Sequence, residues 1–311
     1  MTTRQAVNQY VQARKAGGTH FCAVERLLGT FCRAVGEDVD VTTVTEEQVR
    51  AFLDGQGPIT RYWHRKHSAL HGFYRYAVSR RLVARTPLPC RTPKSPPPFT
   101  PYIYTREELR RLLDATAGAK TWCPEPYTFR ALLLLLYGAG LRVGEALHLA
   151  LDDVDLDSGC LVVRDTKFYK TRLVPLGPHL VGALQQYVAR RPRSRGGQTA
   201  DPRFFVTRDG GPLRESTIRR AFARLRTRAG VLRTDGARYQ PRLHDLRHAY
   251  AVHRVTEWYR QGADVQALLP ALSTYLGHLT VTATQVYLTM TPDLLQQANR
   301  RFERYAMEAV K

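Results

Sequence analysis

The chain lacks several features that would assign it to common classes of protein. Its longest aliphatic run, Leu132–Leu136, is far shorter than the ~20 apolar residues that span a membrane, so we expect a buried helix there. The first residues do not have the basic-then-apolar layout of a secretory signal, and the cytoplasm is therefore the expected location. The five cysteines are odd in number and none forms a close CxxC pair, which argues against a disulfide framework and a zinc knuckle.

Acidic residues are scarce relative to basic ones. The 311 residues include 27 Asp and Glu against 47 Lys and Arg, which gives a formal net charge of +20. Residues 1–100 carry a net charge of +8 and residues 101–311 carry +12, so the excess is spread along the chain. Proteins this basic attract polyanions, of which nucleic acid is the usual one. General solubility is the alternative explanation, because charge alone does not identify a partner.

The sequence also offers no dense cluster of carboxylates of the kind that holds paired magnesium ions. The nearest approach is a short run in which acidic and apolar residues alternate, namely Asp152, Asp153, Asp155 and Asp157. That alternation favours a loop between a helix and a strand. We therefore expect neither a metal nor any other cofactor.

A change of composition divides the chain into two parts. Residues 87–103 are rich in proline, which cannot continue a helix or donate to a sheet, and they predict an extended linker. Residues 1–86 have helical patterns throughout. Residues 104–311 are mostly helical, with short β-prone runs at Cys160–Arg164, Arg172–Pro175 and Phe204–Val206. The predicted fold is therefore mainly α, with a helical first domain and a mixed α/β second domain that has a small sheet.

Two predicted helices are rich in arginine and lysine. In Thr60–Val83, helical spacing directs Trp63, Leu70, Phe73 and Ala77 towards a core and leaves the basic residues on exposed faces. The helix Ser216–Ala229 has a second row of arginines, and one of its faces would fit a major groove. A solvated surface is the alternative reading of both. The candidate DNA contacts are Arg61, Arg65, Lys66, Arg219, Arg220 and Arg224.

Two segments of the second part carry cations in places that suit an anion. Arg142 follows the glycine-broken end of a helix and precedes a new helical turn, a position expected to place its guanidinium beside free backbone N–H groups. The segment Asp165–Leu176 has the pattern of a β-hairpin with Lys167 and Lys170 near its turn. Taken singly, such residues are more often ordinary surface cations.

Two later segments carry histidines. In His244-Asp-Leu-Arg247 the first and last residues share one face of a helix, so both side chains can meet one ligand. In Tyr275-Leu-Gly-His278 the glycine predicts a turn. Tyr287 follows nine residues later and is expected on the next helix. An isolated tyrosine is more often part of a core or a surface than a nucleophile.

The order of these motifs resembles the tyrosine recombinase family, also called the phage integrase family. Gly-x-Gly-Leu-Arg-x-x-Glu-Ala-Leu around Arg142 is similar to the first arginine box of that family. His-x-Leu-Arg-His around Arg247, and Leu-Gly-His278 followed by Tyr287, resemble its second box. The resemblance implies that residues 1–86 form a core-binding DNA-binding domain and residues 104–311 the catalytic domain.

The resemblance also implies a mechanism without a nucleotide cofactor. Tyr287 would attack the scissile phosphate of DNA and form a 3′-phosphotyrosine, while Arg142 and Arg247 stabilise the charge of the transition state. Lys167 would protonate the leaving 5′-oxygen, with Lys170 as the alternative. His244 would help to deprotonate the tyrosine, and His278 would bind the phosphate. Glu145 would orient the cluster.

The implied activity is site-specific recombination, such as integration of a mobile genetic element. The implied partner is double-stranded DNA with a recombination site, bound by a homotetramer on two duplexes, and no membrane is involved. The C-terminal segment Pro292–Tyr305 would pack on a neighbouring subunit, or else on its own. A type IB topoisomerase, which shares the chemistry, and a catalytically silent DNA-binding protein are the two alternative functions.

Overall fold

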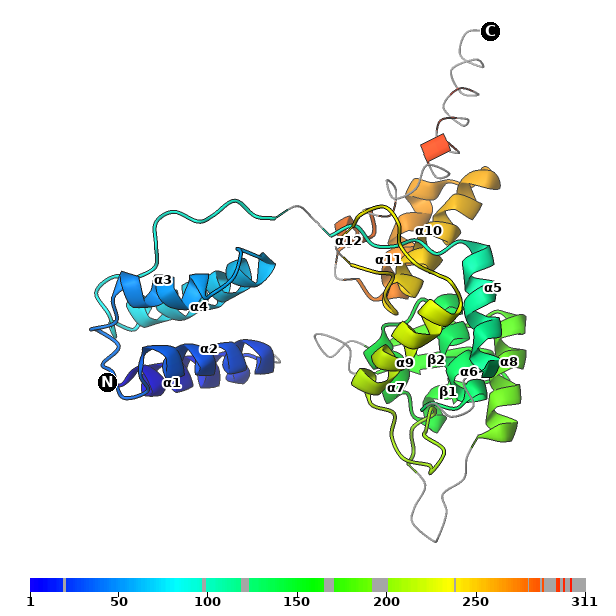
Figure 1. The fold of residues 1–311 in the computed structure, drawn as a ribbon, viewed down its shortest axis with the longest axis horizontal. Coiled ribbons are helices and arrows are strands. Elements are labelled where there is room, and N and C mark those ends of the chain that lie inside the picture. The colour runs from blue at the N-terminus through cyan, green and yellow to red at the C-terminus, as the bar shows by residue number, and fades with distance from the viewer. Residues whose placement is uncertain are drawn as a thin grey trace. The chain divides into compact units, whose positions relative to one another are not determined.

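The computed structural model divides into two compact units, Met1–Phe99 and Thr100–Lys311 (Figure 1). The boundary between them falls inside the proline-rich segment 87–103. In the parts of the chain that the structure describes, no helix is long and apolar enough to cross a membrane. The described residues are 1–18, 21–96, 99–118, 123–164, 171–191, 201–237, 239–278, 280–285, 287, 295–296, 299 and 303.

The first unit consists of helices. They are α1 (Thr3–Ala16), α2 (Cys22–Val35), α3 (Glu46–Asp54) and α4 (Arg61–Ser79). Threonines begin three of them, because each hydroxyl accepts a hydrogen bond from a backbone N–H of the first turn; these are Thr2, Thr45 and Thr60. The helices bury their apolar faces against one another around fully buried residues that include Leu28, Phe31, Leu70 and Phe73.

In helix α4 the side chains predicted to be buried are buried, but one of the basic side chains predicted to be exposed is not. The four residues expected in the core, Trp63, Leu70, Phe73 and Ala77, are all buried. Arg61 and Arg65 are exposed, as expected. The prediction is wrong for Lys66, which is only 8% exposed. Its ammonium donates to the backbone carbonyl of Phe52 at 2.5 Å, so the long apolar stem is buried and the charge is used inside the unit.

The second unit is mainly helical. Its α-helices are α5 (Arg106–Ala115), α6 (Pro126–Gly138), α7 (Val143–His148), α8 (Pro178–Arg190), α9 (Glu215–Arg228), α10 (Asp245–Arg260), α11 (Val265–Leu276) and α12 (Thr282–Gln285). Two 3₁₀ turns, η1 (Thr116–Gly118) and η2 (Leu151–Asp153), complete the helical elements. Helix α6 carries the aliphatic run Leu132–Leu136 and packs against α5, α7, α8 and α10. The expectation of a buried helix is therefore confirmed, and α6 is the centre of this core.

A small antiparallel sheet lies beside these helices. Its order is β1 (Val154–Asp155), β2 (Cys160–Val163) and β3 (Arg172–Pro175). Leu161 pairs with Val174, both buried, and Val163 pairs with Arg172. This register confirms the predicted hairpin and fixes Arg172 at the first position of β3. The segment 165–170, with Lys167 and Lys170, lies outside the described residues.

The third predicted strand, Phe204–Val206, does not form. Both Phe204 and Phe205 are buried, so the segment lacks the alternation of a strand with one solvated face. Isolated bridges flank it, one of which joins Val206 to Pro212. Within the segment, the carbonyl oxygen of Phe204 accepts hydrogen bonds from the side chains of Arg191 and Tyr187 instead of from a strand.

Candidate active site

Arg142 lies where the chain leaves α6 and enters α7. Gly140 makes the turn with a φ of +60°, in the left-handed region that favours glycine, and Arg142 is the residue before the first turn of α7. The prediction that backbone N–H groups here are free is wrong for Arg142 itself, since its N–H donates to Glu145 Oε2 at 2.9 Å. The guanidinium is 35% exposed and so remains accessible.

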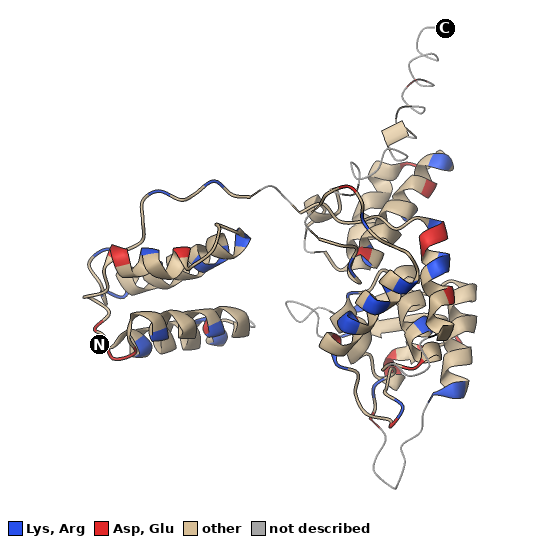
Figure 2. Ribbon diagram, viewed as in Figure 1, with Lys and Arg blue, Asp and Glu red and all other residues tan. Residues whose placement is uncertain are grey.

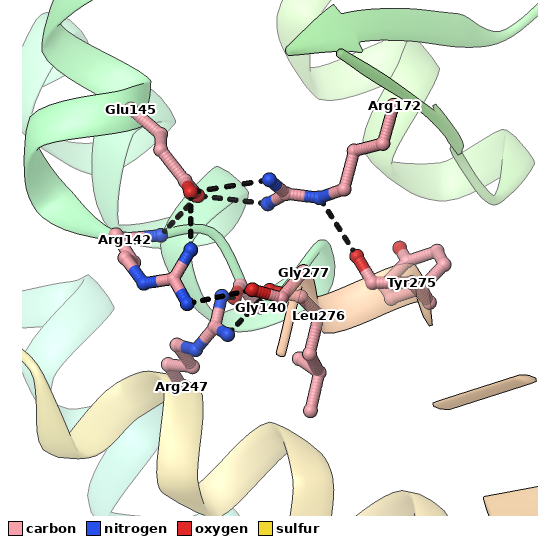
Figure 3. Close-up of polar contacts among 8 residues, drawn as sticks. All are labelled: Gly140, Arg142, Glu145, Arg172, Arg247, Tyr275, Leu276 and Gly277. Carbon is pink, nitrogen blue, oxygen red and sulfur yellow. Dashed lines mark hydrogen bonds and ion pairs between the residues drawn. The ribbon is translucent and has the colours of Figure 1, made fainter. Parts of the chain in front are cut away.

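Glu145 joins two arginines from different elements (Figure 3). The Arg142 guanidinium donates to Glu145 Oε1 at 2.6 Å. Arg172, on β3, donates to both oxygens of the same carboxylate, at 3.1 Å and 2.8 Å. The side chains of Arg172 and Glu145 are 8% and 9% exposed, so this is a buried bidentate pair. The carboxylate therefore fixes the sheet relative to the start of α7.

Backbone carbonyls at and just after the C-terminal end of α11 hold all three arginines of the site (Figure 3). Arg172 donates to the carbonyl of Tyr275 and Arg142 to that of Gly277, both at 2.9 Å. Arg247, only 2% exposed, donates to the carbonyls of Leu276 and Gly140, the latter at 2.7 Å. The last carbonyls of a helix lack partners within it and carry partial negative charge, so they suit guanidinium groups.

The cluster carries an excess of positive charge. Burial alone would raise the pKa of Glu145, but the hydrogen bonds and charges of Arg172 and Arg142 outweigh it and lower that pKa to about 2. Burial and the charge of Arg142 lower the pKa of Arg247 to about 10, which still leaves it protonated at neutral pH. Three guanidinium groups thus face one carboxylate, and the arrangement favours an anion such as a phosphodiester.

Three histidines beside the arginines are neutral at pH 7. Burial lowers the pKa of His244 and of His278 to about 4, and the charge of Arg247 lowers both further. Burial and the neighbouring His244 lower the pKa of His248 to about 3. His278 follows the turn at Gly277, as predicted, and its Nδ1 lies 2.7 Å from the hydroxyl oxygen of Thr284. Neutral imidazoles can donate one hydrogen bond and accept another.

Tyr287 is buried at the same place, with 2% of its surface exposed. It lies two residues beyond Gln285, the last residue of α12, at a position with 3₁₀ geometry. Its hydroxyl is 3.2 Å from His248 Nδ1, and its ring stacks at 6.1 Å on that of His278. Burial raises the pKa of Tyr287, while the charges of Arg247 and Arg142 oppose that rise.

The structure therefore gathers most of the residues that the sequence singled out, although Lys167 lies outside the described residues. Two members of the site were missed: Arg172 and His248. The weak signal for Arg172 is that a charged residue begins an otherwise apolar strand. The weak signal for His248 is that it directly follows Arg247. The residues brought together are Arg142, Glu145, His244, Arg247, His278 and Tyr287.

The acidic run after α7 was predicted to be a loop between a helix and a strand, but it forms the 3₁₀ turn η2, the short strand β1 and the turn that follows β1. Asp153 accepts from the backbone N–H of Ala150 at 3.0 Å and from Arg164 at 2.6 Å. Asp155 Oδ1 accepts from the N–H groups of Asp157 and Ser158. Their oxygens thus serve local hydrogen bonds. Across the described residues, no group of three or more His, Cys, Asp or Glu side chains is placed to hold a metal ion.

Helix α9 presents a row of arginines, seen in blue in Figure 2. Arg219, Arg220 and Arg224 are exposed, and Arg219 pairs with Glu215 one turn earlier. Arg226 donates to the carbonyl of Pro241 at 3.1 Å and so supports the segment that leads into α10. Contact of this face with DNA stays a prediction.

Comparison with known proteins gives a consistent result. The chain matches the Phage integrase family over residues 103–293. A protein of Sinorhizobium fredii named as an integrase/recombinase, y4rB, is 37% identical over 308 residues, which cover 97% of this chain and 98% of that protein. Tyrosine recombinase XerC of Halalkalibacterium halodurans is 33% identical over 241 residues, or 76% of this chain and 73% of XerC.

A solved structure supports the same fold. The Tn1549 transposon integrase in complex with transposon right end DNA superposes with a TM-score of 0.71 over 98% of this chain and 100% of that chain, at 17% sequence identity. At this identity the likeness concerns the fold alone. Together with the family match and the relatives that span most of the chain, it leads to one conclusion: the chain belongs to the phage integrase family, the tyrosine recombinases.

Proposed function

We propose that this tyrosine recombinase cuts and rejoins DNA at a specific site through a covalent 3′-phosphotyrosine on Tyr287. The observation that carries the proposal is the site itself, in which buried Tyr287 lies among neutral histidines and an excess of guanidinium charge. Its relatives are named as recombinases, which favours recombination over the topoisomerase and the silent DNA-binding protein.

In this proposal the arginines bind the non-bridging oxygens of the scissile phosphate. The side chain of Arg142 is partly exposed whereas Arg247 is buried, so a phosphate that enters the site would meet Arg142 first. Charge that develops on phosphorus is stabilised by guanidinium groups already held by Glu145 and by backbone carbonyls. Preorganised donors of this kind are worth about 10²–10³ in rate each. His278 would add a hydrogen bond to the same phosphate.

The leaving 5′-oxygen needs a proton, which we assign to Lys167. This lysine precedes Pro175 by eight residues, in the segment between β2 and β3, and Lys170 is the alternative. Normal cleavage by Lys167→Ala together with loss in Lys170→Ala would reverse the choice. The bond energy stays in the phosphotyrosine, so the reaction uses no nucleotide cofactor and should proceed in EDTA.

The DNA partner would contact both units. The proposed contacts are exposed arginines on α4 and α9, namely Arg61, Arg65, Arg219, Arg220 and Arg224. Lys66 is not among them, because its ammonium is bound inside the first unit. We further propose a homotetramer on two duplexes, with the segment 292–305 exchanged between subunits, that moves a genetic element.

The test is covalent trapping on nicked DNA. A duplex carrying a site selected from randomised DNA is nicked just 3′ of the scissile phosphate, so the cleaved fragment diffuses away and the adduct accumulates. We expect an SDS-resistant adduct with the wild-type chain and with the control Tyr259→Phe, and none with Tyr287→Phe. Absence of an adduct with the wild-type chain would refute the proposal, and site-independent relaxation of supercoils would indicate a topoisomerase instead.

A further inference from the structure

The hydroxyl of Tyr287 is in contact with a histidine other than those the motifs singled out for proton transfer. His248 Nδ1 lies 3.2 Å from that hydroxyl, and the two rings meet at 5.6 Å. His244, which the family resemblance assigned to this task, packs edge-on against His248 with ring centroids 5.0 Å apart. His278 uses its Nδ1 for Thr284. His248 is thus the imidazole whose ring nitrogen reaches the reacting oxygen.

We propose that His248 is a catalytic residue that accepts the phenolic proton when Tyr287 attacks the phosphate. This inference rests on the proposed function and adds a residue to it. The required tautomer has its proton on Nε2, which leaves the Nδ1 lone pair directed at the tyrosine. The position of His248 is fixed by its neighbour on α10, because Arg247 is held by the carbonyls of Gly140 and Leu276.

The proton transfer and the attack conserve atoms and charge. The O–H bond of Tyr287 breaks, its proton passes to His248 Nδ1, and the phenolic oxygen forms a bond to phosphorus. The bond from phosphorus to the 5′-oxygen breaks, and that oxygen takes a proton from the general acid. When the strands are rejoined, the protonated His248 returns its proton to the departing phenolate.

The charges around His248 favour a neutral imidazole that takes up a proton only during the reaction. Burial, His244, Arg242 and Arg247 lower the pKa of His248 to about 3, so its lone pair is free at neutral pH. A bound phosphate adds a negative charge among these cations and therefore favours the imidazolium. The phenol becomes a stronger acid as its oxygen bonds to phosphorus, so proton transfer and attack can proceed together.

The first arm of the test replaces His248 by glutamine, which keeps a hydrogen-bonding side chain but cannot take a proton. The matched control is His253→Gln on the same helix, since His253 Nδ1 makes the same kind of contact, 2.8 Å from the hydroxyl of Tyr137. Single-turnover cleavage of nicked DNA should fall about 100-fold in His248→Gln, in the range of general-base catalysis, and remain unchanged in the control.

The second arm removes the need for the phenolic proton. A chain carrying Tyr287→Phe joins DNA with a 3′-(p-nitrophenyl) phosphate to a 5′-hydroxyl strand, so that no tyrosine attacks the phosphate and nitrophenolate leaves without a proton. Adding His248→Gln to Tyr287→Phe should leave the rate of this joining unchanged. Equal loss in both reactions would mean that His248 serves the fold or the phosphate, and cleavage within about threefold of wild type would mean that it is dispensable; either result overturns the inference.

The two proposals fail in different ways. A wild-type chain without any adduct refutes the proposed function, and with it the foundation of this inference. A wild-type chain that forms the adduct, with a His248→Gln variant that forms it equally fast, refutes the role of His248 alone.

Discussion

Arg172, which no motif singled out, connects the elements that form the site. It spans from β3 to Glu145 and to the carbonyl of Tyr275, so one side chain ties the sheet to α7 and to the end of α11. Glu145 in turn holds Arg142. A guanidinium is suited to this task because its planar fork can bind a carboxylate and a carbonyl together.

Loss of Arg172 should therefore destabilise the protein more than loss of a comparable surface arginine. Arg172→Met removes one partner of a buried pair, which typically costs about 3–5 kcal/mol. The control is Arg164→Met, whose arginine also binds a carboxylate, Asp153, but is 59% exposed and should cost about 1 kcal/mol or less. Urea unfolding measures both. Equal free energies of unfolding for the two variants would contradict the role given to Arg172.

The depressed pKa of Glu145 makes a prediction about acid stability. Its pKa falls from 4.5 to about 2 on folding, so the ionised carboxylate stabilises the protein above pH 4.5, and this contribution is lost as the pH falls towards 2. Glu145→Gln should be less stable than wild type at pH 7. The difference should shrink by about 2 kcal/mol at pH 3, since each pKa unit corresponds to about 1.4 kcal/mol. A difference that stays constant between pH 7 and pH 3 would show that Glu145 is not held as described.

The sequence motifs identified the site residues that stand in a short motif of recognisable spacing. They missed the residues whose part in the site depends on a contact with a residue far away in the sequence. Arg142, Glu145 and Arg247 stand inside short boxes, and the structure brings them together. Arg172 meets Glu145 across 27 residues, and His248 meets Tyr287 across 39. Such pairs depend on how β3, α10 and α12 pack, which local spacing does not encode.

At the scale of elements, the C-terminal end of α11 organises the site. Its last carbonyls and the one that follows accept from the three arginines, and Gly277 ends the helix in the left-handed conformation, with φ +67°. A Cβ at Gly277 would lie 2.8 Å from a guanidinium nitrogen of Arg172. The absence of a side chain there lets the helix end approach the arginines closely.

Gly277→Ala should therefore slow DNA cleavage in addition to lowering stability through the strained backbone. Gly262 also has a positive φ, +71°, but a Cβ there meets nothing within 4 Å, so Gly262→Ala is a matched control. Both variants should lose about 1–2 kcal/mol of stability from the left-handed conformation. Only Gly277→Ala should also slow DNA cleavage, by about tenfold or more if Arg172 and Arg142 are displaced by even a fraction of an ångström. Equal cleavage rates in the two variants would contradict this view of the helix end.

Elements with strong local signals were predicted well. The sequence pattern Thr105-x-x-Glu108 predicts the start of a helix, and α5 begins there because the threonine hydroxyl and the glutamate carboxylate each accept a hydrogen bond from the other's N–H. Hairpin β2–β3 also formed where predicted. The strand predicted at 204–206 does not form, because side chains of Arg191 and Tyr187 bind the carbonyl of Phe204, a tertiary feature that an apolar triplet cannot reveal. The burial of Lys66 could not be predicted for the same reason, since its ammonium donates a hydrogen bond to a backbone carbonyl on α3.

At the scale of the whole molecule, the net charge of +20 points to a phosphate-rich partner. If six to ten phosphates are contacted, DNA affinity should fall roughly 10³–10⁵-fold between 50 and 200 mM salt. Arg65→Ala should reduce the slope of log affinity against log salt by about one, as expected for loss of a phosphate contact. Its neighbour Lys66 is buried, so Lys66→Met should lower stability and leave the slope unchanged. A salt-independent affinity would contradict DNA binding through phosphates.

The central claim is that the nucleophile is Tyr287, and peptide mapping of the trapped adduct tests it most directly. Trypsin cuts after Arg260 and Arg300, so the peptide between them contains both Tyr275 and Tyr287. Fragmentation by tandem mass spectrometry distinguishes the two tyrosines. The account predicts a 3′-phosphonucleotide on Tyr287 and an unmodified Tyr275, whereas a nucleotide on any other residue, or one linked through its 5′ end, would contradict it.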